Sequence, residues 1–407
     1  MKSARLHSVI LCALVLLAAG CGNQAPPVSS TTSISTPAAC VPATKPEFSY
    51  VLTGYAVSMY TVNSCTGQFT PTSPASVATG YSYPQNDAEE MVADPLGRFA
   101  YVANLVSNAT DLATISSFTI NPTTGVLTPT TPATVPTGFF PQEIAIDPQG
   151  RFVYTANSDD ATVSMFTINQ TTGVLNPTSP ASVSTMVPGN VLWQPSFLTV
   201  DPTGKFLYVT ELLSNDAAIL MFNIDQTTGL LSPTSPATVL TFGSPWQVAV
   251  APNGKFAYVV NNDSGGAYTD GVGEYTLNST TGVLTTNALV PGTLAYVAAG
   301  NAPTAIAVDP TSHFAYVVNR IDSNVSMYTI DPETGNLTLN TTKAYPLGIV
   351  GAGSEPFRID FDPTGKFVYV TNEGSAASIY TVNTDGTLAP AGTTGSSGLA
   401  TAFTVSQ

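Results

Sequence analysis

The strongest constraint on the fold is a short phrase that recurs along the chain about every 50 residues. It reads DPTGKFVYVTN at residues 362–372 and DPTGKFLYVT at residues 201–210. Close variants stand at Asp94, Asp147, Ala251 and Asp309. The repeated tyrosine supplies seven markers, 50 to 58 residues apart: Tyr50, Tyr101, Tyr154, Tyr208, Tyr258, Tyr316 and Tyr369. A steady period of this length predicts a repeat architecture made of one supersecondary unit.

Each unit contains four short segments of strand character. In the sixth unit they read TAIAVDP, FAYVVN, NVSMYTID and GNLTLN. Alternation and β-branched residues favour strands, and no segment reaches helical length. The D-P-x-G between the first two segments predicts a type I turn. The N/D-x-T-T-G between the third and fourth predicts a hairpin loop with glycine at positive φ. Seven such units predict an all-β fold, a seven-bladed β-propeller with four antiparallel strands per blade.

The two ends of the repeat region indicate how the ring closes. The first unit starts at FSYVLT and lacks an innermost strand, whereas the chain ends in ATAFTVSQ at residues 400–407. We therefore expect the C-terminal strand to complete blade 1, which leaves no partial blade and no open edge. A stacked solenoid would need capping units instead.

The repeated phrases AYVAN, VYTAN, LYVTE, AYVVN and VYVTN resemble the signature of the YVTN-repeat, lactonase-type seven-bladed propellers. The resemblance covers residues 47–407. That family includes 6-phosphogluconolactonases, carboxymuconate-cyclising enzymes and exported propellers with no settled role. The resemblance therefore implies the fold strongly and the activity weakly.

The N-terminal segment has the pattern of a targeting signal. Lys2 and Arg5 precede an apolar stretch that is short for a membrane span, and LAAGC follows at residues 17–21. This resembles a bacterial lipobox, so we expect residues 1–20 to be a lipoprotein signal peptide and Cys21 to be lipidated. An ordinary secretory signal that is cut nearby is the alternative. Residues 21–46 are rich in Ser, Thr and Pro and predict a flexible tether before a propeller at residues 47–407.

Export to the bacterial cell envelope, with a lipid anchor in the membrane, places the remaining cysteines in an oxidising compartment. Cys40 and Cys65 are then expected to form a disulfide, with two unpaired thiols as the alternative. The formal net charge of −15 argues against nucleic-acid binding and against docking on anionic lipid. A monomer is expected, with a small molecule, a glycan or an envelope protein as partner.

Alignment of the predicted inner strands brings charged residues to one arc of the central channel. Five of the inner strands have a Pro six residues before the Asp position of the turn. Two residues after this place the seven blades carry Ala402, Glu90, Glu143, Phe197, Gln247, Ala305 and Arg358 in order. Asp360 shares a strand face with Arg358, and Glu89 and Gln142 lie beside the acidic pair. Arg358 could grip a carboxylate or a lactone carbonyl while Glu143 or Glu90 acts as a base. It could instead neutralise the acids and hold the channel together.

The blade connectors and the loops between the second and third strands vary among the copies, which suggests a binding face. Trp193, Trp246 and Phe357 lie where connectors enter blades, and such aromatics could stack a sugar or anchor a protein. A hydrophobic plug between blades is the alternative.

Histidine is scarce, with His7 in the signal and His313 in a turn, which argues against His-dependent metal sites and Ser-His-Asp triads. By resemblance, lactonase-type enzymes place histidine near the start of inner strands, where this chain has none. We expect no metal or cofactor, although carboxylate-bound Ca²⁺ at Asp263 and Asp270 is conceivable. The sequence favours a ligand-, glycan- or protein-binding scaffold, with a lactone hydrolase or lactone-forming enzyme in the central funnel as the alternative.

Overall fold

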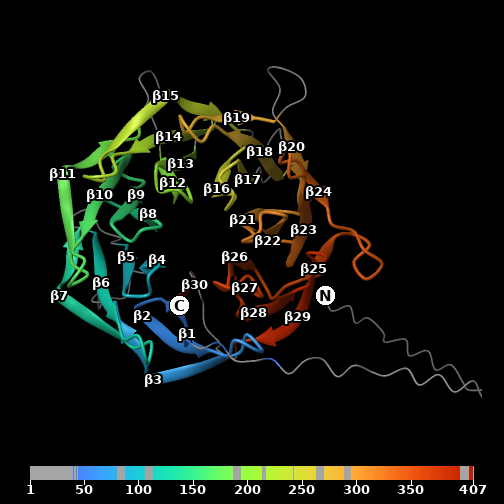
Figure 1. The fold of residues 1–407 in the computed structure, drawn as a ribbon, viewed down its shortest axis with the longest axis horizontal. Coiled ribbons are helices and arrows are strands. Elements are labelled where there is room, and N and C mark those ends of the chain that lie inside the picture. Colours follow the sequence, from blue (N-terminus) through green and yellow to red (C-terminus); the bar gives the residue numbers. More distant parts are fainter. Residues whose placement is uncertain are drawn as a thin grey trace, which may run out of the picture. The chain divides into compact units, whose positions relative to one another are not determined.

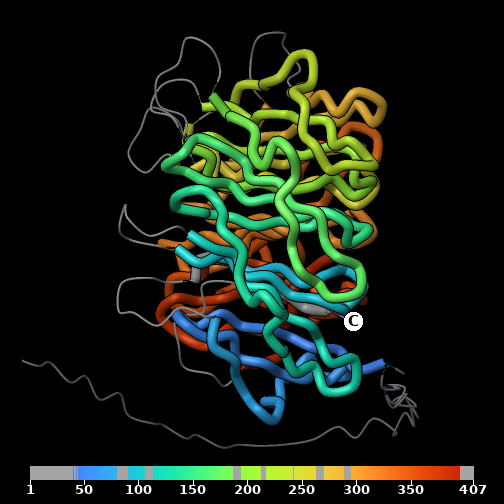
Figure 2. Tube along the Cα trace, turned by 90° about the vertical axis from the view of Figure 1, so that its left-hand side faces the viewer, coloured from blue at the N-terminus to red at the C-terminus, as the bar shows by residue number. Residues whose placement is uncertain are grey.

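The computed structural model describes residues 40, 43, 45–79, 88–105, 113–186, 194–212, 217–241, 243–262, 270–287, 295–394 and 403–406. The chain divides into two compact units, Met1–Val41 and Pro42–Gln407, and the second unit is a ring of seven antiparallel sheets (Figure 1). Figure 2 shows this ring from its edge, with the strands running between its two faces. Within the described ranges, no helix has the length and apolar character needed to cross a membrane. The predicted seven-bladed β-propeller is confirmed.

Each blade is an antiparallel sheet whose four positions are arranged in order from the centre of the ring to its rim. The innermost strands of blades 1 to 7 are β30 (Phe403–Ser406), β4 (Ala88–Ala93), β8 (Pro141–Ile146), β12 (Gln194–Val200), β16 (Pro245–Val250), β21 (Pro303–Val308) and β26 (Pro356–Phe361). The second strands are β1 (Glu47–Thr53), β5 (Phe99–Asn104), β9 (Phe152–Asn157), β13 (Phe206–Leu212), β17 (Phe256–Asn261), β22 (Phe314–Asn319) and β27 (Phe367–Asn372). These second strands carry the repeated tyrosines.

The outer half of each blade follows the same order. The third strands are β2 (Ala56–Val62), β6 (Thr114–Ile120), β10 (Thr162–Ile168), β14 (Ala218–Ile224), β18 (Gly271–Leu277), β23 (Asn324–Ile330) and β28 (Ser375–Val382). The outermost strands are β3 (Phe69–Ala78), β7 (Leu127–Pro136), β11 (Leu175–Ser184), β15 (Leu231–Leu240) and β29 (Leu388–Thr393) in blades 1 to 4 and 7. In blades 5 and 6 two short strands share this place: β19 (Leu284–Thr286) with β20 (Tyr296–Ala298), and β24 (Leu337–Leu339) with β25 (Ile349–Gly351). The PTSPA-type motif that continues the strand in blades 1 to 4 is missing from both.

The C-terminal strand closes the ring as the sequence predicts. β30 pairs antiparallel with β1, with Phe403 opposite Val51 and Val405 opposite Ser49. The apolar cores show the same closure, because each of seven buried clusters draws its side chains from two neighbouring blades. The last cluster joins Phe367 and Tyr369 of blade 7 to Val51 and Tyr60 of blade 1.

The repeated tyrosine explains why the motif recurs. Tyr154 donates its hydroxyl to the carbonyl of Gly229 in the third-to-fourth-strand loop of the next blade, at 2.9 Å. The same clamp occurs at all seven blade junctions and ends with Tyr369 on Gly67 of blade 1. Gly229 has φ +75°, and a Cβ there would stand 2.5 Å from the ring of Phe152. Both the turn and the close approach of the neighbouring blade therefore require glycine.

Candidate functional site

A cavity of about 230 Å³ lies at the centre of the ring. It is lined by inner strands β4, β8, β12, β16 and β26. In each of these strands, and in β21, the pairing with the second strand of the blade shifts register near the start of the strand. The residues that follow the shift are Glu90, Glu143, Phe197, Gln247, Ala305 and Arg358. Such bulges re-aim side chains locally, and all of these residues except Ala305 line the cavity.

Arg358 occupies the centre of a charged cluster. Its Nη2 atom lies 2.5 Å from Glu90 Oε2 and 2.8 Å from Glu143 Oε2. The guanidinium carbon is 5.3 Å from the ring centre of Phe197 and 5.7 Å from that of Phe357. Both glutamates are buried, and the buried Nε of Arg358 has no hydrogen-bond partner among the described residues. Within the described part of the chain, Arg358 is therefore held by its ion pairs to the two glutamates and by the two aromatic rings.

Burial dominates the protonation of these acids. It raises the pKa of Glu90, and it raises the pKa of Glu143 well above the usual range, with the charge of Glu90 adding to the effect. Arg358 opposes both shifts. The pKa of Asp360, also on the cavity wall, rises to about 7 through burial and then through the Glu90 charge. Because three carboxyl groups share one guanidinium, we expect the cluster to hold a proton near neutral pH. A cluster in that state would offer both a carboxylate and a carboxylic acid, the two groups that acid–base chemistry requires.

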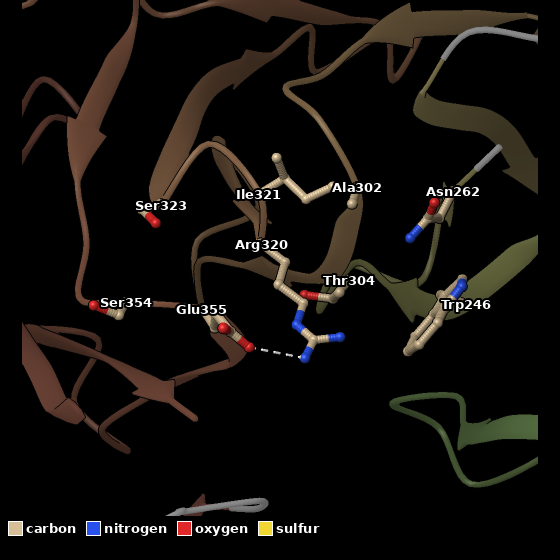
Figure 3. A pocket seen from close by; sticks show the side chains of 9 residues that line it. All are labelled: Trp246, Asn262, Ala302, Thr304, Arg320, Ile321, Ser323, Ser354 and Glu355. Carbon is tan, nitrogen blue, oxygen red and sulfur yellow. Dashed lines mark hydrogen bonds and ion pairs between the residues drawn. The ribbon is translucent and has the colours of Figure 1, made fainter. Parts of the chain in front are cut away.

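A second cavity, of about 510 Å³, lies on the side of the connectors and of the loops between second and third strands (Figure 3). Its walls are Trp246, Asn262, Ala302, Thr304, Arg320, Ile321, Ser323, Ser354 and Glu355. Arg320 Nη2 lies 3.1 Å from Glu355 Oε2 and 2.5 Å from Glu373 Oε2. Phe357 connects the two sites, because its ring lies 6.0 Å from the Arg320 guanidinium and 5.7 Å from that of Arg358.

The structure brings most of the predicted site residues to these two cavities. Asp360 and Gln247 line the central one, and Gln247 Oε1 accepts a 2.7 Å hydrogen bond from the Ile306 N–H. Trp246 lines the second cavity and packs perpendicular to Phe357, with ring centres 6.1 Å apart. Gln142 lies at the bulge of β8 and does not line the central cavity.

Several other predicted residues fall elsewhere. Trp193, Cys21, Asp263 and the side chain of Glu89 lie outside the described residues. Cys40 and Cys65 are both disulfide-bonded. Asp270 accepts a hydrogen bond from the Ala302 N–H at 2.7 Å, and no group of acids, histidines or cysteines in the described ranges is arranged to hold a metal ion.

The sequence did not predict the role of two charged residues, one in the second cavity and one in the core of blade 4. Arg320 was assigned only to a loop, and its pairing with Glu355 and Glu373 joins segments 35 and 53 residues away. Glu211 was treated as part of a repeat phrase, yet it is fully buried in blade 4. The signal for Glu211 was present, because it replaces the asparagine that ends this phrase in other blades.

Comparisons with known proteins agree with the fold. The family described as lactonase, 7-bladed beta-propeller, matches residues 47–193 and 195–404. A 6-phosphogluconolactonase of Pectobacterium carotovorum is 36% identical over 93 residues, which cover 22% of this chain and 27% of that enzyme. Its counterpart in Pectobacterium atrosepticum is 32% identical over 92 residues, or 21% of this chain and 26% of the enzyme. The matched stretch thus spans about a quarter of these curated relatives.

Solved structures extend the likeness to the whole ring. A putative 6-phosphogluconolactonase of Bacteroides fragilis superposes with a TM-score of 0.69 at 20% identity, covering 90% of this chain and 99% of the other. The periplasmic gluconolactonase of Pseudomonas aeruginosa gives a TM-score of 0.60 at 18% identity, over 84% of this chain and 94% of the other. At these identities the likeness shows the fold alone.

Proposed function

Because this chain belongs to the lactonase family of seven-bladed β-propellers, we propose that its central cavity hydrolyses a sugar lactone. The observation that carries the proposal is Arg358, held between Glu90 and Glu143 in a cavity at the ring centre. The two curated relatives are named 6-phosphogluconolactonases, and one solved neighbour is named a gluconolactonase. This reverses the order of the two functions favoured by the sequence alone.

The cluster has the parts that lactone hydrolysis needs. A carboxylate of the pair takes a proton from water as the water oxygen bonds to the lactone carbonyl carbon. The guanidinium stabilises the negative charge that develops on the carbonyl oxygen. The bond from that carbon to the ring oxygen then breaks, and the ring oxygen takes a proton from the carboxylic acid of the cluster. The product is an open-chain hydroxy acid. No histidine stands among the described residues that line the two cavities, so we assign the acid–base role to carboxyl groups.

The charge balance points to an unphosphorylated lactone. Glu90, Glu143 and Asp360 outnumber Arg358 in the central cavity, and Arg320 is neutralised by Glu355 and Glu373. Neither arginine is free to pair with a phosphate dianion, which would meet excess negative charge instead. We therefore expect glucono-1,5-lactone to react more efficiently than its 6-phosphate.

The test measures acid release from glucono-1,5-lactone, corrected for its spontaneous opening in water. Glu143→Gln should lower kcat by about 100-fold or more, in line with loss of a positioned acid or base. Arg358→Lys should lower kcat/KM strongly, because lysine keeps the charge and loses the planar fork. Glu333→Gln, at an exposed turn, is the matched control and should keep the parental rate. Wild-type rates in the first two variants would overturn the assignment.

The predicted binding role of the variable face is retained as a second function. The observation that favours it is the cavity around Trp246 and Arg320, which is larger than the central one. A lipid-anchored location in the envelope also remains a proposal, and globomycin-sensitive processing that is lost in Cys21→Ser would test it.

A further inference from the structure

The cavity around Trp246 and Arg320 is built from three blades. Trp246 is the second residue of β16 in blade 5, Thr304 is the second residue of β21 in blade 6, and Glu355 directly precedes β26 of blade 7. Arg320 and Ser323 come from the turn that follows β22. In Figure 3 the Arg320 guanidinium lies between Glu355 and Trp246. The walls thus come from the first residues of two inner strands, from the turn after β22 and from the connectors that lead into β21 and β26.

The chemistry of the walls is amphipathic. Trp246 offers a half-buried indole to the cavity. Ala302 and Ile321 add small apolar surface. An amide, three hydroxyls, a guanidinium and a carboxylate complete the lining: Asn262, Thr304, Ser323, Ser354, Arg320 and Glu355. One aromatic plane beside several fixed donors and acceptors suits a ring that is apolar on its faces and rich in hydroxyls at its edge.

The charge of the cavity excludes an anionic ligand. Both carboxylates that pair with Arg320 lie within 3.1 Å of its Nη2 atom, so this corner carries one more negative than positive charge. The pairing also fixes the guanidinium, and Phe357 lies against it with its ring centre 6.0 Å away. Planar Arg and Glu groups held in this way can donate to and accept from the vicinal hydroxyls of a neutral ring.

We propose that this cavity binds a neutral sugar ring, with Trp246 as its stacking surface and Glu355 and Arg320 as its hydroxyl partners. Phe357, which contacts both arginines, places the cavity next to the central site. It follows, resting on the proposed lactonase function, that the substrate is a glycosylated lactone. The lactone ring occupies the central cavity and the attached sugar occupies the outer one.

Sugar binding can be measured without any catalysis. The sequence has two tryptophans, so Trp193→Phe leaves Trp246 as the single indole reporter. We expect its fluorescence to change saturably with cellobiose or maltose and to stay constant with glucose 6-phosphate. Calorimetry on wild type should give the same affinity order. Absence of saturable binding of both disaccharides would overturn the proposal, as would tighter binding of the phosphate.

Variants assign the binding to this cavity. Glu355→Gln changes a side chain that is 60% exposed, so the protein should fold normally, and disaccharide binding should weaken by about 3- to 10-fold. Trp246→Ala should weaken it by at least about tenfold. Phe139→Ala removes an exposed aromatic from the connector into blade 3 and is the matched control, with unchanged affinity expected. Equal affinity in Glu355→Gln and wild type would contradict the assignment.

Kinetics separate this inference from the proposed function. We expect cellobiono-1,5-lactone to show a KM about tenfold lower than glucono-1,5-lactone, and Glu355→Gln to remove most of that difference. Disaccharide binding without hydrolysis of either lactone would refute the lactonase function and leave the sugar site standing. Hydrolysis of both lactones with equal KM in wild type and Glu355→Gln would refute the link between the two cavities.

Discussion

A buried acid in blade 4 makes the stability of the propeller depend on pH. In blade 3 the matching residue, Asn157, donates its side-chain amide to the hydroxyl of Ser164 at 2.9 Å. Blade 4 has Glu211 in place of the asparagine and Leu220 in place of the serine. Glu211 is fully buried, and it has no basic side chain as an ion-pair partner among the described residues. Burial raises its pKa from 4.5 to about 8, with a smaller opposing effect from the Thr185 hydroxyl.

The direction of the pH effect follows from this shift. The folded protein holds the Glu211 proton up to about pH 8, whereas the unfolded chain releases it near pH 4.5. Stability from this group is therefore complete below pH 4.5 and falls as the pH rises through 8. A difference of one in pKa corresponds to about 1.4 kcal/mol, so the loss reaches about 3–5 kcal/mol. Glu211→Gln keeps the shape of the protonated acid and removes the titration.

The measurement is urea unfolding of wild type and Glu211→Gln between pH 5 and 8.5, followed by tryptophan fluorescence. We expect the two free energies of unfolding to be similar near pH 5 and the variant to be more stable by about 3 kcal/mol or more at pH 8.5. The exposed Glu333→Gln should track wild type throughout. A difference between Glu211→Gln and wild type that does not change with pH would refute the reasoning.

Three further predictions test the ring itself. Tyr154→Phe leaves the buried Gly229 carbonyl without its 2.9 Å partner and should cost about 1–3 kcal/mol in urea unfolding, while Tyr55→Phe at an exposed turn should be neutral. Gly254→Ala and Gly229→Ala both place alanine at positive φ, which costs about 1–2 kcal/mol, but only Gly229→Ala also drives a Cβ into Phe152. Equal melting temperatures for these two variants would contradict the close-packing argument. Removal of residues 401–407 exposes the edge of β1, so we expect concentration-dependent oligomers in light scattering. A strictly monomeric product with the stability of wild type would argue against closure by β30.

The fold was predictable because the strand and turn pattern of one blade recurs seven times in the sequence. The spacing of the tyrosines, the D-P-x-G turns and the missing first strand together predict blade number and closure, and β30 pairs with β1 as expected. The divided outer strands of blades 5 and 6 were not predicted. The length of an outermost strand depends on which residues hydrogen-bond to the third strand of the blade. β-propensity alone does not determine where that pairing is interrupted.

The central cluster was predictable for the same reason. Strand alternation and a shared bulge put Glu90, Glu143 and Arg358 at equivalent depth, so aligning the copies was enough to bring them together. The outer cavity was predictable only in part: Trp246 was assigned to a binding face, whereas the pairing of Arg320 with Glu355 across two loops was not foreseen. Their meeting depends on how three connectors turn, and local sequence carries little of that information.

The tyrosine clamps have a consequence for how such a chain can grow. Each blade supplies the hydroxyl for its successor and the carbonyl for its predecessor, so an extra copy inserted by gene duplication carries both halves of the contact with it. Every junction between blades therefore keeps its tyrosine–glycine hydrogen bond after the insertion. The number of repeats is then limited by the angle between neighbouring blades. The C-terminal strand can pair with the first blade only when these angles add up to a full turn around the axis.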